Sequence, residues 1–208
     1  MFELYLVTDE KLCLGRPVAE VVEQAVSGGV TAVQLREKHL STKDFVQRSF
    51  QLKKILSVYH VPLIINDRID VALAVKADGI HVGQSDMPYD YFTKIIPAQM
   101  IRGLSVETPE QAAEAENYRL DYLSVSPLFL TSTKRELEHE WGLEGLRHLA
   151  AKTKHTVVAI GGINKSNAAE VFKSGAKGIA VVSAICSAPD PWVAARELKS
   201  IIEQLKIL

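Results

Sequence analysis

Cysteine is scarce in this chain of 208 residues, because Cys13 and Cys186 are its only two cysteines. They could pair, but they lack the close spacing of a zinc site, and we expect them to be reduced in the cytoplasm. No apolar run approaches the roughly 20 residues of a membrane-spanning helix. The N-terminus lacks a basic segment followed by an apolar one, so we expect no signal peptide and a cytoplasmic location.

Charge of one sign is also missing. The formal net charge is -1, and the 24% of residues that are charged form no long block of one sign. This is a poor electrostatic footprint for nucleic acid or an anionic membrane, so we expect neither as a partner. The hydrophobic fraction of 47% is ordinary for a globular protein. We expect one catalytic domain over residues 1–208, and the sequence leaves a homo-oligomer open.

What the chain does contain is a repeated pattern of a helix-like stretch, a glycine turn and a short apolar strand. It appears in residues 27–36, 76–82 and 174–182. A glycine there is a natural helix C-cap, and short aliphatic strands are typical of parallel strands covered by helices. The predicted strands lie near 3–7, 31–36, 62–66, 79–82, 100–104, 121–125, 156–160 and 178–182. The predicted helices cover 17–27, 42–58, 68–75, 108–118, 164–174 and 191–205, and another begins at Met87–Pro88.

Eight alternating strand and helix units predict an α/β fold of the (β/α)8 TIM barrel type, at the small end of its size range. An open doubly wound sheet gives a similar alternation. The count of eight, and the absence of Gly-x-Gly-x-x-Gly after the first strand, favour the barrel. In such a barrel the active site is built at the carboxyl ends of the strands.

Two carboxylates follow neighbouring predicted strands. Asn66 and Asp67 end the apolar run that begins at Val61, and Asp86 follows the next strand. Oxygen ligands from one or two carboxylates, together with substrate phosphates, suit Mg²⁺. The alternative for each aspartate is an N-cap of the helix that follows it. We interpret His81 as a packed, hydrogen-bonded strand residue rather than a catalytic base.

Basic and amide side chains follow the second predicted strand. With a period of two, Gln34, Arg36 and Lys38 share one side of the chain. Arginine can bind two phosphate oxygens and lysine adds a compact charge, so the group suits a phosphorylated ligand. The alternative is a solvated loop. Ser105, after the fifth strand, either donates to a phosphate or caps a turn.

Two further segments suit phosphate. Thr131, Thr133 and Lys134 lie in the long loop after the sixth strand, which is either a binding loop or a solvated surface loop. Gly162 follows the seventh strand, and residues 182–183 end the eighth. The loops after strands seven and eight form the recurrent phosphate site of such barrels.

Several motifs in the same order resemble those of the thiamin phosphate synthase family. They are the segments 33–38, 63–68, 78–86, 131–134 and 158–163, and the resemblance runs from Tyr5 to Pro191. The family joins a hydroxymethylpyrimidine diphosphate to a thiazole phosphate and releases diphosphate. The resemblance implies that these two small molecules are the substrates and that Mg²⁺ is the cofactor.

The resemblance also implies a role for each candidate residue. Asp67 and Asp86 would hold Mg²⁺. The groups around the pyrimidine diphosphate would be Gln34, Arg36, Lys38, Asn66, Ser105 and Lys134. Of these, the catalytic groups would be Arg36, Lys38, Ser105 and Lys134. The thiazole phosphate would contact Thr131, Thr133, Gly162, Val182 and Ser183.

Four positions depart from the family pattern. Leu130 replaces a usual proline, Ser124 and Ser126 replace glycines, and Glu107 replaces a histidine. A sister group, the thiazole tautomerases, uses a histidine in that region and tends to lose the magnesium carboxylates, so the synthase is preferred here. The remaining alternative is a phosphate-ligand binder or regulator without catalysis.

Overall fold

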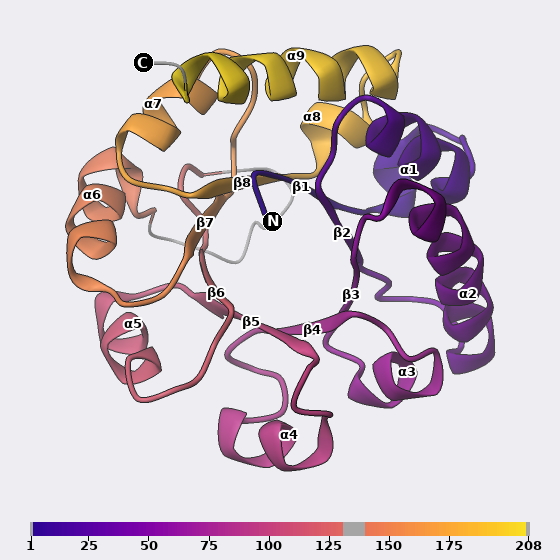
Figure 1. Cartoon of the computed structure of the whole chain (residues 1–208), viewed down its shortest axis with the longest axis horizontal. Coiled ribbons are helices and arrows are strands. Elements are labelled where there is room, and N and C mark those ends of the chain that lie inside the picture. Colours follow the sequence, from indigo (N-terminus) through magenta and orange to yellow (C-terminus); the bar gives the residue numbers. More distant parts are fainter. Residues whose placement is uncertain (1, 131–139, 207–208) are drawn as a thin grey trace.

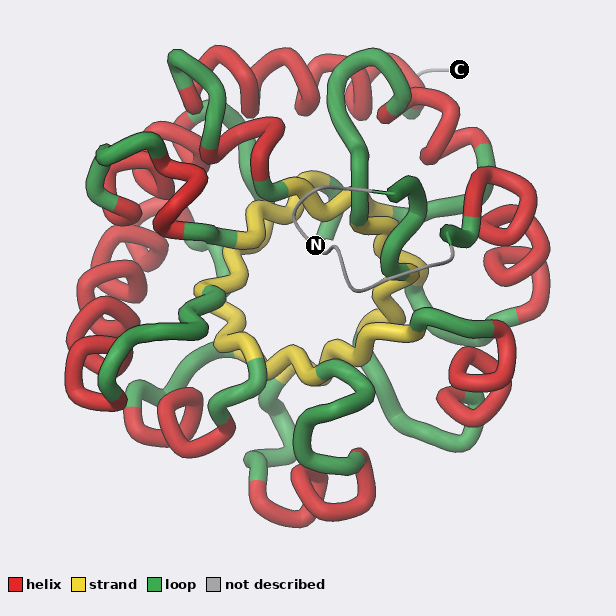
Figure 2. Tube along the Cα trace, turned by 180° about the vertical axis from the view of Figure 1, so that it is seen from behind, coloured by secondary structure: helices red, strands yellow, loops and turns green. Residues whose placement is uncertain are grey.

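The strands form a closed barrel. The computed structural model describes residues 2–130 and 140–206. All neighbouring strands are parallel, they pair in sequence order, and β8 pairs with β1. Figure 2 shows this ring of strands inside the helices. The strands are β1 (Leu4–Val7), β2 (Ala32–Leu35), β3 (Leu63–Asn66), β4 (Gly79–Val82), β5 (Ile101–Val106), β6 (Tyr122–Val125), β7 (Val157–Ile160) and β8 (Gly178–Val181). The predicted (β/α)8 barrel is therefore confirmed, and the open sheet is excluded.

Helices surround the barrel on the outside (Figure 1). In the described residues they are η1 (Glu10–Cys13), α1 (Val18–Ser27), α2 (Thr42–Tyr59), α3 (Ile69–Ala74), α4 (Tyr89–Ile95), α5 (Pro109–Ala115), α6 (Gly142–Lys152), α7 (Ala168–Lys173), α8 (Ser183–Cys186) and α9 (Pro191–Leu205). The predicted helices are confirmed within a few residues at most ends. The prediction missed α6 and η1. The Thr108 hydroxyl accepts from the Gln111 backbone N–H, which is the N-cap expected for α5.

The side chains of each strand alternate between two cores. In β1, Leu4 and Leu6 pack outward against the helices, while Tyr5 and Val7 point into the barrel. The interior core closes the amino-terminal end of the barrel around Tyr122, whose ring centroid lies 4.5 Å from that of Phe2. The same alternation leaves the inward positions near the carboxyl ends of the strands for polar side chains.

Glycine has a different role in one repeat from the role that the sequence predicted. Gly29 and Gly175 adopt φ of +115° and +104° after their helices, as expected of C-caps. After α3, however, Lys76 takes the left-handed conformation with φ of +50°, and the predicted cap Gly79 lies inside β4. A Cβ on Gly79 would lie 2.5 Å from Ile64 Cδ1. The glycine is needed there for strand packing, so that cap prediction was wrong.

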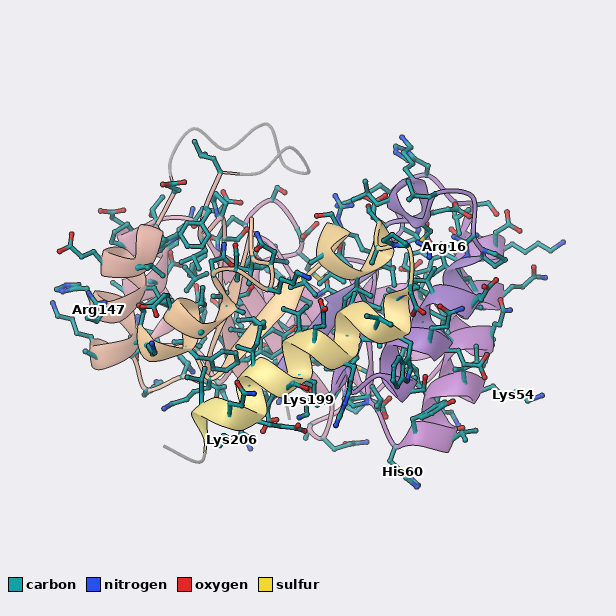
Figure 3. The ribbon with its side chains drawn as sticks, turned by 90° about the horizontal axis from the view of Figure 1, so that it is seen from above. Arg16, Lys54, His60, Arg147, Lys199 and Lys206 are labelled. Atoms are coloured by element: carbon teal, nitrogen blue, oxygen red, sulfur yellow. The ribbon has the colours of Figure 1, made fainter. Side chains whose placement is uncertain are left out.

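Ion pairs join the residue before the first strand to the last helix and to the residue after it. Glu3 pairs with Lys199 at 2.8 Å and also with Lys206. Figure 3 labels Lys199, which lies on α9, and Lys206, which follows its last residue. Cys13 and Cys186 are buried and not bridged. No helix in the described ranges is long and apolar enough to cross a membrane.

Candidate active site

A cavity of about 670 Å³ opens at the carboxyl ends of the strands. It is lined by ten of the residues that the sequence singled out. They are Gln34, Arg36, Lys38, Asn66, Asp67, Asp86, Ser105, Gly162, Val182 and Ser183. The other three predicted residues, Thr131, Thr133 and Lys134, lie outside the described residues. The structure thus brings the described candidates together, and their individual roles stay predictions.

Asp67 projects its carboxylate into this cavity. Its backbone has φ of +60°, and its N–H donates to the carbonyl of His81 at 2.8 Å. The carboxylate accepts from Lys38 Nζ at 2.5 Å and from the Asn66 amide. Helix α3 begins without a side-chain cap, so the capping alternative for Asp67 is wrong.

Asp86 lies beside Asp67. Its carboxylate accepts from the Gly83 backbone N–H at 2.7 Å, and α4 has no side-chain cap. The capping alternative is therefore wrong here too. Burial raises the pKa of Asp86, and the hydrogen-bonded neighbour Asp67 raises this pKa further. Two carboxylates that disfavour each other's charge would gain from a cation between them.

The donor set fits a magnesium ion. Within residues 2–130 and 140–206 no group of three or more His, Cys, Asp or Glu side chains could hold a metal. A complete protein cage is therefore not built from these residues. Asp67 and Asp86 instead offer two neighbouring carboxylates, and Mg²⁺ is usually held by one or two carboxylates together with water and substrate phosphates.

The basic side of the cavity adjoins a clamp, formed by the two ion pairs that Arg48 makes with Glu37 and Glu10. Arg36 and Lys38 line the cavity, and between them the Glu37 side chain is 6% exposed and accepts from Arg48 Nη1 at 2.5 Å. The other Arg48 nitrogen, Nη2, donates to Glu10 at 2.7 Å. Burial raises the pKa of Glu37, while Arg48 opposes that rise. The clamp ties η1 and α2 to the residue that lies between the two cations in the sequence.

Arg36 also has a contact of its own. Its guanidinium lies 3.6 Å from the carboxylate of Asp9, and its backbone N–H donates to Thr8 Oγ1 at 3.1 Å. Asp9 in turn accepts from two backbone N–H groups of η1. The loop after β1 is therefore part of the wall of the site.

The floor of the cavity is polar and hydrogen-bonded. His81 Nε2 lies 2.8 Å from Ser105 Oγ, and His81 Nδ1 lies 2.8 Å from the Tyr122 hydroxyl. Tyr122 contacts the Tyr5 hydroxyl at 2.9 Å, which accepts from Gln34 Nε2 at 3.0 Å. His81 is thus packed and hydrogen-bonded, as predicted.

The opposite wall is mostly backbone. Gly161 and Gly162 follow β7 with φ of +111° and +66°. A Cβ on Gly162 would lie 2.9 Å from Phe129 Cβ, so the glycines let the loop after β6 pack closely. Ser183 begins α8, as the sequence suggested. These backbone segments face the cavity beside Val182.

Sequence reasoning missed some lining residues. Tyr5, Thr8 and Gln84 line the cavity but were not predicted. Tyr5 and Thr8 carried a signal, because they lie on or just after the first strand of a barrel. Gln84 donates to the carbonyl of Ser105 at 2.6 Å, a contact between two strand ends that spacing does not reveal.

The departures from the family pattern fall at the same place. Glu107, Ser124 and Ser126 line the cavity. Leu130 is 59% exposed. Three of the four differences therefore alter the cavity surface itself.

Comparison with known proteins gives a consistent result. A family model described as thiamine monophosphate synthase matches residues 4–185. The chain belongs to the thiamine monophosphate synthase family. A thiamine-phosphate synthase of Albidiferax ferrireducens is 52% identical over 200 residues, with 96% of this chain and 91% of that protein covered. One from Vibrio parahaemolyticus is 47% identical, with 97% and 98% covered.

The solved structures agree with the sequence relatives. Thiamine phosphate pyrophosphorylase from Pyrococcus furiosus superposes with a TM-score of 0.90 at 42% identity, covering 98% of this chain and 96% of the other. A 3-hexulose-6-phosphate synthase superposes at 0.68 with 18% identity, which shows a shared fold alone. The resemblance seen in the motifs is confirmed, and the chain is a transferase of thiamine biosynthesis.

Proposed function

We propose that this member of the family condenses hydroxymethylpyrimidine diphosphate with thiazole phosphate to give thiamin phosphate and diphosphate, with Mg²⁺ as cofactor. The observation that carries the proposal is the convergence of an acidic pair and a basic pair in one cavity. Asp67 and Asp86 face Lys38 and Arg36 there. A metal bound to two carboxylates and a diphosphate bound to two cations are complementary in charge.

The reaction needs charge stabilisation more than proton transfer. The bond between the pyrimidine methylene carbon and the diphosphate oxygen breaks, and the oxygen keeps the electron pair. The thiazole nitrogen then gives its lone pair to that carbon, forming the new C–N bond. No proton moves in either event, so the site requires no general base.

The protein residues would act on the departing charge. Arg36 and Lys38 would bind the diphosphate oxygens, and Ser105 and Lys134 would donate to them. A magnesium ion held by Asp67 and Asp86 would supply further positive charge to the leaving group. Gln34 and Asn66 would hold the pyrimidine. Thr131, Thr133, Gly162, Val182 and Ser183 would hold the thiazole phosphate and so set the two substrates in line.

Two features favour this reaction over the alternatives. Glu107, rather than the histidine of the tautomerases, lines the cavity, and so do both carboxylates proposed to bind the metal. The relatives compared above are named as synthases. A binder without catalysis would not need the acidic pair, in which burial and then the neighbouring Asp67 raise the pKa of Asp86.

The test uses the purified protein, both phosphorylated substrates and Mg²⁺, with thiamin phosphate detected as fluorescent thiochrome. Asp67→Asn and Asp86→Asn keep the size of the side chain and remove its charge. Each is expected to lower kcat at least about 100-fold, the scale for losing one preorganised electrostatic group. EDTA should abolish product formation, and added Mg²⁺ should restore it.

The matched control is Asp90→Asn, an exposed aspartate on α4 that does not line the cavity. It should retain full activity. Full activity of Asp67→Asn and Asp86→Asn would instead overturn the metal assignment. Absence of product from the wild-type protein, with turnover of thiazole carboxylate phosphate in EDTA, would show a tautomerase.

A further inference from the structure

Five buried side chains from five strands form one hydrogen-bonded chain beneath the cavity. It runs from Gln34 Nε2 to the Tyr5 hydroxyl (3.0 Å), and from there to the Tyr122 hydroxyl (2.9 Å). It continues to His81 Nδ1 (2.8 Å), and His81 Nε2 then reaches Ser105 Oγ (2.8 Å). None of the five is more than 8% exposed. Its two ends, Gln34 and Ser105, both line the cavity.

Packing holds the middle of this chain in place. The rings of His81 and Tyr122 stack at 5.5 Å between centroids, and Tyr5 meets Tyr122 edge-on at 82°. Gly103 lies against their junction, where an added Cβ would collide with the Tyr122 hydroxyl and with His81. The hydrogen bond between Tyr122 and His81 is therefore possible because β5 has a glycine at this position.

The number of hydrogens that each group carries fixes which group donates in each hydrogen bond of this series. Burial raises the pKa of both Tyr5 and Tyr122 above its ordinary value, so each phenol keeps its single hydrogen. The Gln34 amide nitrogen only donates, so the Tyr5 oxygen accepts from it and passes its own hydrogen to Tyr122. Tyr122 then donates to His81 Nδ1, and the ring hydrogen must be on Nε2.

A doubly protonated imidazole does not fit the same count. Both ring nitrogens of His81 would donate, and Tyr122 would have to turn its hydrogen toward Tyr5. The hydrogen of Tyr5 would then have no acceptor within the chain, because Gln34 presents its amide nitrogen there. Leaving a buried donor unsatisfied is costly, so the neutral ring is favoured.

We propose that the chain from Gln34 fixes His81 as its Nε2–H tautomer, and that His81 is a positioning residue that turns the Ser105 hydroxyl hydrogen into the cavity. Because Ser105 Oγ accepts from His81, its own hydrogen is free to donate to a ligand. Resting on the proposed function, that ligand atom is an oxygen of the diphosphate, and the donor is oriented before the substrate arrives.

The tautomer can be measured without any substrate. Long-range ¹H–¹⁵N spectra of the ¹⁵N-labelled protein show which ring nitrogen carries the hydrogen, and His81→Asn identifies the His81 signals among the six histidines. We expect the Nε2–H form. An Nδ1–H form or a doubly protonated ring would overturn the proposal, whatever the protein catalyses.

Reversing one end of the chain should reverse the tautomer. In Gln34→Glu at alkaline pH, the ionised carboxylate can only accept, so Tyr5, Tyr122 and His81 Nδ1 should each donate toward it. His81 is then expected in the Nδ1–H form. Adding Tyr122→Phe removes the hydroxyl that contacts His81 Nδ1 and should abolish the reversal. An unchanged tautomer in Gln34→Glu, or a reversal that persists with Tyr122→Phe, would contradict the proposed path.

Catalysis gives an independent readout. A glutamine at this position can place an amide N–H near the site of Nε2, whereas asparagine is too short to reach Ser105. His81→Asn should therefore lower kcat by roughly tenfold, the scale of one hydrogen bond, with KM for thiazole phosphate nearly unchanged. His81→Gln should restore most of the loss.

The outcomes separate this proposal from the proposed function. Equal, unimpaired kcat in both His81 variants, with Asp86→Asn inactive, would remove the positioning role and leave the synthase reaction standing. A wild-type protein without synthase activity would remove the proposed function, and the tautomer of His81 would still decide the direction of the chain.

Discussion

Asp67 combines a rare backbone conformation with a charged role. At φ of +60° it lies in the left-handed region, which aspartate and asparagine enter more readily than other non-glycine residues. This conformation turns the carboxylate toward Lys38 rather than toward the first turn of α3. A substitution that removes the charge of Asp67 should therefore introduce asparagine, because a β-branched residue would add backbone strain to the loss of charge.

Gly103 lies where the floor leaves no room for a side chain. In Gly103→Ala the added methyl group would overlap the Tyr122 hydroxyl and His81, which are held from several sides. We expect the free energy of unfolding to fall by about 1–3 kcal/mol, as in other overpacked cores. Urea denaturation followed by circular dichroism measures the change.

The control for that substitution is Gly145→Ala. Gly145 lies in α6, where a Cβ would be 3.3 Å from Trp141 Cε3 and alanine favours the helix. Its stability should change by less than about 1 kcal/mol. A Gly103→Ala protein as stable as this control would mean that the floor is loosely packed.

At the scale of elements, α2 supports the basic wall of the site through one side chain. Arg48→Met would leave the buried carboxylate of Glu37 without its partner, between the two cations Arg36 and Lys38. We expect a loss of roughly 1–3 kcal/mol of stability and a raised KM for the pyrimidine diphosphate, because the end of β2 is released. Urea denaturation and steady-state kinetics measure the two effects.

Arg48→Lys separates charge from geometry. A lysine keeps the positive charge but cannot hold Glu37 and Glu10 with two parallel donors, so it should recover only part of the loss. Lys43→Met, at an exposed position on the same helix, should change neither quantity. An Arg48→Met enzyme with wild-type KM would show that the clamp does not position the wall.

The sequence was most informative about the strands. Each predicted strand overlaps the observed one to within two residues at either end, because short aliphatic runs between glycine turns are specific to buried parallel strands. Helix α6 was missed since it follows a highly charged segment and contains Gly142 and Gly145, which weaken the helical pattern. The ten predicted lining residues were found because they follow strand ends.

The hydrogen-bonded floor could not be predicted in the same way. Tyr5 and Tyr122 are 117 positions apart, and their contact depends on the tilt and register of all the strands between them. The left-handed Lys76 and Asp67 were also missed, since neither is a glycine. Contacts that depend on closure of the barrel have no local signal in the sequence.

At the scale of the whole molecule, closure of the barrel brings the two ends of the chain together. The ion pairs that Glu3 makes there depend on pH. The hydrogen bonds from Lys199 and Lys206 lower the pKa of Glu3 from its usual 4.5 to about 2. A lowered pKa means that the folded state favours the carboxylate. The contribution of Glu3 to stability is therefore complete above about pH 4.5 and is lost as the pH falls from 4.5 toward 2.

We expect Glu3→Gln to melt below the wild type at neutral pH and to approach it as the pH falls through that range. Thermal unfolding of both proteins in a series of buffers measures the difference. Glu197→Gln, which breaks the exposed pair with Lys165, should show a much smaller difference throughout. A Glu3→Gln difference that stays constant with pH would contradict a role for the ionised carboxylate.

Phe2, Tyr5 and Tyr122 pack together and close the barrel at its amino-terminal end, so the cavity does not continue through the barrel. Substrates and products would then enter and leave through the same opening, at the carboxyl ends of the strands. Whichever molecule lies deeper must enter before its neighbour and cannot depart until that neighbour has gone. Under the proposed reaction, a blocked exit of this kind would show itself as an ordered kinetic pattern, in which one product competes with only one of the two substrates.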